Sequence, residues 1–235
     1  MAPDTVVVIN PNNPDGGLIA HDELVAFVAR MHGRVRQVIV DESFGAFTTL
    51  DEPPTLAPLV TQMPHLVVIS SLSKSHGIAG LRLGYAVATP LRARQLKRAS
   101  LWNLNAFAEW FCELLADDDY RRTYEHARRR YIRETRHLFA GLAELPGVKA
   151  YPSAANFALL ELDRSASDVA TELLVRHGVY VRDCADKRGL DGNHFLRVAV
   201  RSEPDNARIL TALTDVLTER ASHAAPGSRV AATQP

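Results

Sequence analysis

The first half of the chain alternates short apolar runs with helix-length amphipathic stretches. Continuous apolar runs of strand length occupy residues 6–9, 38–40 and 66–69, and residues 83–87 form a further candidate. Such runs are typical of strands that are buried on both faces. Apolar residues from Leu24 to Met31 recur with helical spacing between the first two runs, which predicts a helix with one buried face. Strands separated by helix-length connections predict an α/β fold with a mostly parallel sheet.

The pattern becomes helical from about Pro90 to Leu145. In its Arg-rich part, apolar residues recur every three or four positions. This spacing predicts a long helix whose arginines form a solvated basic face. Pro146 and Gly147 are expected to end it.

A second α/β block follows the long helix. It is expected to contain strands at 157–160, 179–181 and 195–200, a helix around 168–177, and a last helix that begins near Ser202. Beyond about Ser222 small and polar residues dominate, which predicts a disordered tail. We therefore expect residues 1–122 to belong to a large domain, residues 123–221 to form an interdomain helix with a small C-terminal domain, and residues 222–235 to be the tail.

The composition argues against several classes of protein, namely nucleic-acid-binding, disulfide-rich, metal-binding and membrane-spanning proteins. The 27 basic residues balance 27 acidic ones, which argues against a nucleic-acid-binding protein. Two cysteines are too few for a disulfide framework or a Cys-rich metal site, so we expect no metal and a reducing cytoplasm. The sequence predicts no membrane span and no signal peptide. Lysine is rare: there are only four, at positions 74, 97, 149 and 187.

Three polar loops follow predicted strands, at the sheet edge where open parallel sheets bind their ligands. The first, at 10–17, is NPNNPDGG; its prolines and glycines are typical of a turn, and a rigidly held Asn could also face a ligand. The second, at 41–44, is DESF; its first carboxylate, Asp41, ends a buried strand and needs a partner. A helix cap or a structural ion pair is the alternative interpretation of that carboxylate.

The third loop, SSLSKSHGIAGLRLGY at 70–85, combines hydroxyls, glycines, Lys74 and Arg82. A lysine that forms a Schiff base needs partial desolvation, which lowers its pKa, and the small apolar neighbours of Lys74 predict such an environment. Hydroxyls together with an arginine suit a phosphate group. A solvated surface lysine is the ordinary alternative.

In this order, the three loops resemble the signature of the class I/II aminotransferase superfamily, the pyridoxal-phosphate (PLP) enzymes of aspartate-aminotransferase fold. The resemblance extends from about Val6 to Leu217, so that residues 1–122 would be the C-terminal part of the PLP-binding large domain. It implies that Lys74 binds PLP as an aldimine and moves the proton in catalysis. It further implies that Asp41 pairs with the pyridine nitrogen, Asn13 with the phenolic oxygen, and Ser71, Ser73 and Arg82 with the phosphate.

Other residues indicate the branch of the superfamily. Members usually carry Tyr where this chain has Phe44, and the Phe version is similar to the threonine-phosphate decarboxylases of cobalamin biosynthesis. By this resemblance Arg182 and Arg197 bind the phosphate or carboxylate of a small amino-acid substrate. On a predicted strand, Arg197 alone would more often be a surface or ion-paired residue. A histidinol-phosphate or general amino-acid aminotransferase remains the alternative, because both reactions start from the same cofactor adduct.

The resemblance does not include the N-terminal part of the family. No counterpart is found for the N-terminal third of the family, which carries a Gly-containing phosphate loop and the aromatic residue that stacks on the cofactor. The sheet is then expected to show an unpaired edge or an exposed apolar face. A third hypothesis, of a different class, is a non-catalytic remnant or subunit. The family implies a homodimer.

Overall fold

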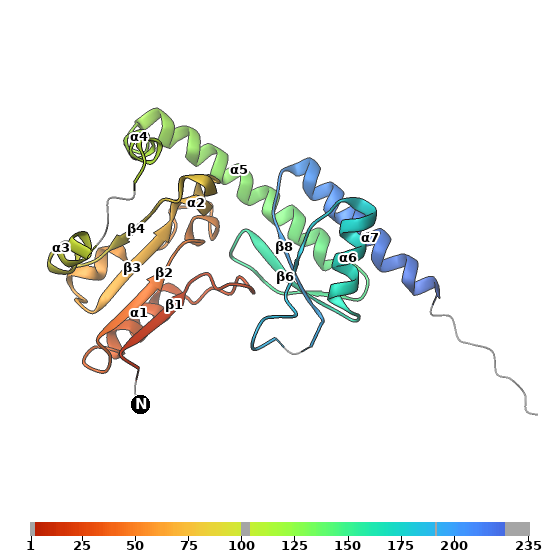
Figure 1. The fold of residues 1–235 in the computed structure, drawn as a ribbon, viewed down its shortest axis with the longest axis horizontal. Helices are drawn as coiled ribbons and strands as arrows, with labels where there is room; N and C mark the ends of the chain where they lie inside the picture. Colours follow the sequence, from red (N-terminus) through yellow and green to blue (C-terminus); the bar gives the residue numbers. More distant parts are fainter. Residues whose placement is uncertain (1–2, 100–103, 191, 224–235) are drawn as a thin grey trace, which may run out of the picture. The chain divides into compact units, whose positions relative to one another are not determined.

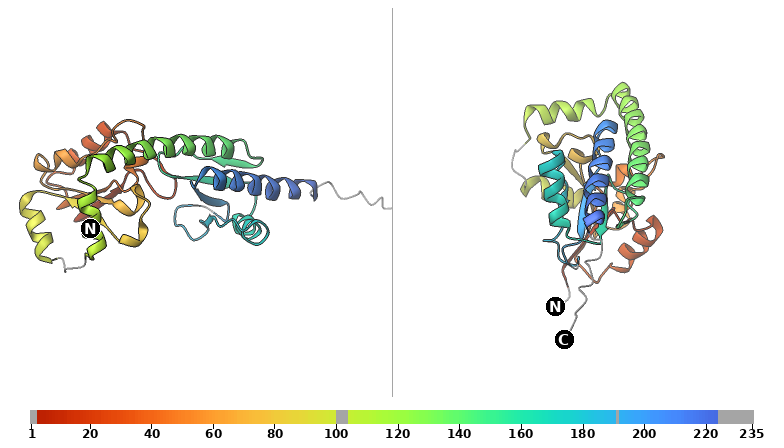
Figure 2. Two further views of the ribbon diagram at one scale, coloured as in Figure 1. Left: turned by 90° about the horizontal axis from the view of Figure 1, so that it is seen from above. Right: turned by 90° about the vertical axis from the view of Figure 1, so that its right-hand side faces the viewer.

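The computed structural model describes residues 3–99, 104–190 and 192–223. The chain divides into two compact units, which are described separately below. The first unit is Met1–Arg136 with Tyr151–Leu159, and the second is His137–Ala150 with Leu160–Pro235. Helix α5 (Asp118–Ala143) and strand β6 (Phe157–Leu162) each contribute residues to both. Figures 1 and 2 show the elements of each unit.

The first unit is built on a four-stranded sheet in the order β1-β2-β3-β4. Strands β1 (Thr5–Ile9), β2 (Gln37–Asp41) and β3 (Leu66–Ser71) are parallel, and β4 (Gly84–Val87) runs antiparallel to β3. Helix α1 (His21–Arg30) makes the crossover from β1 to β2. The predicted mixed α/β architecture with a mostly parallel sheet is confirmed.

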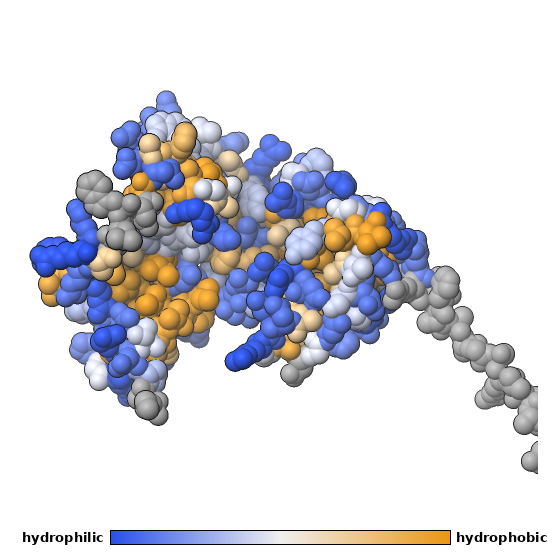
Figure 3. Space-filling view, in the orientation of Figure 1, coloured by the Kyte–Doolittle hydropathy of each residue, from blue (hydrophilic) through white to orange (hydrophobic). Residues whose placement is uncertain are grey.

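One face of this sheet is covered by the core of the first unit. Val38, Val40, Leu66 and Val68 on the strands pack with α1 and with the 3-10 helix η2 (Ala57–Thr61). The opposite face differs, because Val7 is 58% exposed and its neighbour on the same face, Ile9, is 37% exposed. Figure 3 shows an apolar area over β1 to β3 on this side. Among the described residues, one face of the sheet is therefore buried, and the other exposes apolar side chains at β1 while Val67 of β3 on that face is buried.

Among the described residues, the helical stretch predicted after the sheet contains three helices, and the long helix predicted for its Arg-rich part is the last of them. They are α3 (Pro90–Ala99), α4 (Ala106–Leu114) and α5, in which Ile132, Leu138 and Leu142 are buried. The solvated basic face predicted for α5 is correct for most of its arginines but wrong for Arg128, which is 5% exposed. Arg128 is buried because backbone carbonyl groups of a neighbouring loop surround its guanidinium.

The second unit carries a smaller sheet in the order β5-β6-β8-β7, which comprises β5 (Val148–Ala150), β6, β8 (Phe195–Ala199) and β7 (Arg182–Asp183). Helices α6 (Ala166–His177) and α7 (Glu203–His223) contact each other and enclose its core with leucines such as Leu173, Leu213 and Leu217. Ser165 caps α6 by accepting a hydrogen bond from the Asp168 N–H.

Two local predictions for the second unit need correction or restriction. The strand expected at 179–181 is wrong: Val179 and Val181 are buried, but the ladder to β8 begins only at Arg182, and the Val179 N–H instead bonds to the Leu173 carbonyl at the end of α6. Of the predicted tail, residues 222 and 223 lie in α7, and residues 224–235 lie outside the described residues.

Candidate functional site

Polar side chains meet at the carboxyl ends of β2 and β3 in the first unit. They line an open pocket of about 430 Å³, a volume typical of small-ligand sites. Four of the residues predicted from the sequence lie in this pocket, namely Asp41, Ser71, Ser73 and Arg82. The pocket is also lined by Ser43, Ser70, Gly84 and Tyr85, to which the sequence motifs gave no role. A carboxylate, several hydroxyls and a guanidinium can bind a ligand that carries both a cationic nitrogen and an anionic group.

Ser43 connects the two strand ends. The backbone N–H of Ser43 donates to Asp41 Oδ1 at 2.9 Å, and the Ser43 hydroxyl accepts a hydrogen bond from the Ser71 N–H, also at 2.9 Å. These two bonds fix the Asp41 carboxylate relative to the start of the loop after β3. Ser43 belongs to the DESF motif, two residues after Asp41. Its place in this motif was the only indication in the sequence that it could belong to the site.

The adjacent carboxylates Asp41 and Glu42 have different surroundings. Glu42 accepts hydrogen bonds from the Thr55 hydroxyl at 2.5 Å and from the Leu56 N–H at 2.8 Å, just before η2. Burial raises the pKa of Glu42 above its ordinary value, although these two bonds oppose the shift. Glu42 is thus held by structural hydrogen bonds near η2, whereas Asp41 lines the pocket.

Lys74 lies on the four-residue helix α2 (Leu72–Ser75), directly after β3. Its Nζ is 6.0 Å from the centre of the Phe44 ring, and that ring packs edge-on against Phe157 with 5.1 Å between centroids. The predicted desolvation of Lys74 is not present, because Lys74 is exposed, as are residues 77–80 after α2. Lys74 does not line the pocket, although Ser73 beside it does.

The remainder of α2 is held by aromatic side chains. His76, which received no role from the sequence, stacks on Tyr124 of α5 with 4.3 Å between centroids and 13° between planes. Burial lowers the pKa of His76, which favours the neutral ring. The Tyr124 hydroxyl donates to the Ser75 carbonyl at 3.3 Å. These contacts attach the segment that carries Lys74 to α5.

Arg82 has an unusual backbone conformation. It follows the 3-10 helix η3 (Ala79–Leu81) with φ 53° and ψ 43°, the left-handed region that favours glycine. It is the only non-glycine residue with positive φ among the residues that the structure describes. Its Nη1 donates to the Ala79 carbonyl at 3.1 Å, and its side chain lines the pocket. A residue with this strained backbone conformation thus brings a positive charge to the pocket.

Asn13 lies in the loop after β1, at the same edge of the sheet, since Ile9 pairs with Asp41 in the β1–β2 register. The loop needs Gly16, whose φ is 71° and whose added Cβ would lie 1.9 Å from Ser153 Oγ. Asn13 is exposed and does not line the pocket. The structure therefore groups Asp41, Ser71, Ser73 and Arg82 in one pocket, and Asn13 and Lys74 are not among its lining residues.

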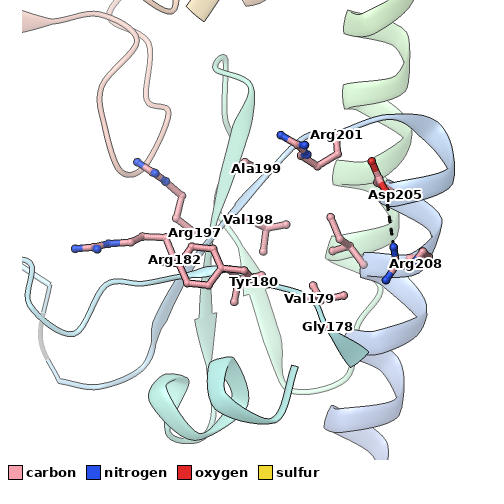
Figure 4. Close-up of a pocket in the computed structure, with 12 residues that line it drawn as sticks. Gly178, Val179, Tyr180, Arg182, Arg197, Val198, Ala199, Arg201, Asp205 and Arg208 are labelled. Atoms are coloured by element: carbon pink, nitrogen blue, oxygen red, sulfur yellow. Dashed lines mark ion pairs between the residues drawn. The ribbon is translucent and has the colours of Figure 1, made fainter. Parts of the chain in front are cut away.

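The second unit holds the two predicted substrate arginines. Arg182 of β7 and Arg197 of β8 are directly opposite each other in the antiparallel ladder, so their side chains share one face. Figure 4 shows both extending in the same direction. They line a pocket of about 270 Å³ together with Tyr180, Arg201 and Arg208. Arg182 forms an ion pair with Asp186 at 2.8 Å, and Arg208 lies 4.0 Å from Asp205. The sequence analysis did not assign Arg201 and Arg208.

The described residues contain no group of three or more His, Cys, Asp or Glu side chains that could hold a metal ion. No helix within the described ranges has the length and apolar character needed to cross a membrane.

Comparison with known proteins gives a consistent result. The family model for aminotransferase class I and II matches residues 2–213. An L-serine phosphate decarboxylase of Campylobacter jejuni is 38% identical over 223 residues, which are 92% of this chain and 57% of that protein. The threonine-phosphate decarboxylase of Salmonella typhimurium is 34% identical over 92% of this chain and 58% of its own length. A histidinol-phosphate aminotransferase of Caldanaerobacter subterraneus is 33% identical over the same shares.

The solved structures agree with these relatives. A decarboxylase from Sulfurospirillum multivorans matches 91% of this chain and 62% of its own chain with a TM-score of 0.85 at 38% identity. The chain spans less than two thirds of the length of these relatives, as the sequence analysis expected. Because the family model covers most of the sequence, this chain belongs to the class I and II aminotransferases.

Proposed function

We propose that this chain carries the cofactor- and substrate-binding residues of a PLP-dependent decarboxylase that acts on a phosphorylated hydroxy-amino acid. The observation that carries the proposal is the pocket in which Asp41, Ser71, Ser73 and Arg82 come together beside Lys74. The curated relatives support the substrate class, because two of the most similar ones are an L-serine phosphate decarboxylase and a threonine-phosphate decarboxylase.

The donor set of the pocket fits PLP. Arg82 and the hydroxyls of Ser71 and Ser73 suit its phosphate, and the Ser70 hydroxyl is a further donor in the same pocket. The Asp41 carboxylate, held by the Ser43 N–H, suits the protonated ring nitrogen. Lys74 would supply the amine that holds the aldehyde carbon, with release of water, and Asn13 would be the partner of the phenolic oxygen. When bound, PLP supplies an electron sink for negative charge at the substrate Cα.

The remaining steps belong to the chain's own side chains. Lys74 Nζ returns a proton to the substrate Cα after the bond from Cα to the carboxylate has broken and CO2 has left. Phe44 offers an apolar ring near Nζ and has no hydroxyl that could bind the cofactor. Arg182 and Arg197, which line the pocket of the second unit, are the residues that we propose to bind the anionic groups of the substrate.

A histidinol-phosphate aminotransferase is the second candidate, supported by the 33% identity to such an enzyme. Phe44 favours the decarboxylase, since the sequence signature of the aminotransferases usually has tyrosine there. The third candidate is a non-catalytic remnant or subunit. The placing of the enzyme in cobalamin biosynthesis, its cytoplasmic location and its homodimeric state stay predictions. Light scattering of the purified chain tests the dimer.

The experiment begins with the purified chain and PLP. We expect a visible absorption band of bound PLP that Lys74→Ala abolishes and that Lys97→Ala, a change of an exposed lysine on α3, leaves intact. Absence of the band in the unaltered chain contradicts the proposal for this chain and favours the remnant.

If the band is present, two reactions separate the enzyme candidates. Release of CO2 from L-serine phosphate or L-threonine phosphate supports the decarboxylase. Transfer of the amino group from histidinol phosphate to 2-oxoglutarate, without CO2 release, supports the aminotransferase instead.

A further inference from the structure

Arg128 of α5 is a buried cation whose partners are mostly backbone carbonyl groups. Its side chain is 3% exposed. Nη1 donates to the carbonyls of Ala46 and Thr49 at 2.9 and 2.6 Å, and Nη2 donates to those of Leu50 and Asp51 at 3.0 and 2.8 Å. The guanidinium therefore binds four carbonyl groups of one short segment.

Glu125 holds the guanidinium from the other side. Its two carboxylate oxygens accept from Nε and Nη2 of Arg128, each at 2.8 Å. Arg128, together with Arg129, lowers the pKa of Glu125 to about 2, so the carboxylate is charged at neutral pH. Every nitrogen of the guanidinium is thus engaged, which is the condition for burying a charge at low cost.

The segment bound by Arg128 continues directly from the cofactor-binding motif. Residues 41–44 carry Asp41, Ser43 and Phe44, and the 3-10 helix η1 (Gly45–Phe47) follows without a break. Within η1 the Phe47 N–H bonds to the Phe44 carbonyl at 3.1 Å. Arg128 therefore fixes the far end of a turn whose near end carries the Asp41 carboxylate and the Ser43 bridge.

The same face of α5 also contacts the Lys74 segment. Tyr124 precedes Arg128 by one helical turn, and its hydroxyl reaches the Ser75 carbonyl. Tyr131, on the next turn, packs against Phe47 with 5.7 Å between ring centroids. One helix face thus holds both the segment after β2 and the segment after β3.

We propose that Arg128 is a positioning residue: by binding the carbonyls of residues 46–51 it sets the place of Asp41 and Phe44 relative to Lys74. The inference rests on the function proposed above. A lysine could not replace Arg128, because one ammonium group offers three donors at a single point and cannot reach four carbonyls and a carboxylate together.

The first test uses hydrogen exchange and needs no cofactor. In Arg128→Lys and in Glu125→Gln, we expect the amides of residues 43–51 to exchange roughly tenfold faster, the effect of losing a charge-assisted hydrogen bond. Arg129→Met is the matched control, because Arg129 also pairs with Glu125 but its side chain is 51% exposed. It should leave this exchange unchanged. Arg128→Met serves as a second variant that removes the charge entirely.

The second test measures PLP in the same variants. We expect Arg128→Lys to weaken PLP binding roughly tenfold and to move the midpoint pH of the visible band of bound PLP, while Arg129→Met changes neither. A role in stability alone would lower the melting temperature without moving that midpoint.

The outcomes separate the inference from the proposed function. An unaltered chain that binds no PLP refutes the function, and the exchange data then decide the inference by themselves. Faster exchange confined to residues 43–51 supports it. Unchanged exchange, or faster exchange throughout the first unit, overturns it, as does an unchanged midpoint pH in a folded Arg128→Lys protein that binds PLP.

Discussion

The hydroxyl of Ser43 accepts a hydrogen bond from the Ser71 N–H at 2.9 Å, which joins the loop after β2 to the end of β3. Both residues line the pocket that we assign to PLP. The bond makes the position of the Asp41 carboxylate depend on the position of Ser71, whose hydroxyl we propose to bind the phosphate, because Ser43 also binds Asp41 through its backbone N–H.

Loss of the Ser43 hydroxyl should weaken cofactor binding more than it weakens the fold. Ser43→Ala leaves the partly buried Ser71 N–H without its acceptor, at a cost of about 1 kcal/mol in the free energy of unfolding and about tenfold in PLP affinity. Absorbance titration with PLP and chemical denaturation measure the two effects. Ser75→Ala is the control, since its hydroxyl contacts His76 and does not line the pocket. Equal losses in both variants would contradict the role of Ser43.

Phe44 should contribute strongly to stability. It is 8% exposed and packs edge-on against Phe157, so Phe44→Ala is expected to lower the free energy of unfolding by about 3 kcal/mol. Phe107→Ala on α4 should change it by less than about 0.5 kcal/mol, because Phe107 is 75% exposed. Urea denaturation of the two variants makes the comparison. Similar losses would mean that the Phe44 ring is not packed as described.

Gly16 should be irreplaceable where its neighbour is not. Its φ of 71° and the 1.9 Å approach of an added Cβ to Ser153 Oγ predict that Gly16→Ala destabilises the protein by about 2 kcal/mol. Gly17→Ala meets nothing closer than 3.5 Å and has no positive φ, so it should be nearly neutral. The melting temperatures of the two variants measure the two losses of stability. A decrease for Gly17→Ala as large as that for Gly16→Ala would contradict the loop geometry.

The Glu125–Arg128 pair should make stability depend on acidity. The pKa of Glu125 is lowered from 4.5 to about 2, so its stabilising effect is complete above pH 4.5 and is lost as the pH falls towards 2. Because the side chain of Glu125 is 39% exposed, we expect the effect to be no more than about 1 kcal/mol. The difference in melting temperature between the unaltered chain and Glu125→Gln should shrink across this range. A difference that stays constant from pH 7 to pH 3 would contradict the pairing.

Strands β1, β2 and β3 could be predicted because each contains a continuous apolar run that is covered on at least one face, whereas β4 is mostly exposed and was predicted from its apolar residues alone. The prediction of a strand at 179–181 was wrong because the apolar pattern reports burial and not hydrogen bonding. Val179 and Val181 are buried, but the hydrogen-bonded ladder to β8 begins only at Arg182. Strand β5 was not predicted, since its three residues provide too little pattern.

The candidate site was predictable where chemistry and strand ends coincide, as at Asp41 and Ser71. Ser43 and Arg128 were not found, because their roles depend on contacts with backbone groups. The periodicity of a sequence indicates which residues lie on one face of a helix. It does not indicate that the carbonyl oxygens of a neighbouring loop surround Arg128 and not the other arginines of α5.

The left-handed backbone of Arg82 has an evolutionary consequence. A glycine at this position would relieve a strain of about 1 kcal/mol and at the same time remove the guanidinium from the pocket. Selection for a more stable chain alone would therefore replace Arg82 with glycine, whereas selection for an anionic ligand would retain it. The residue found at position 82 in laboratory-evolved descendants would report which of the two properties had been under selection.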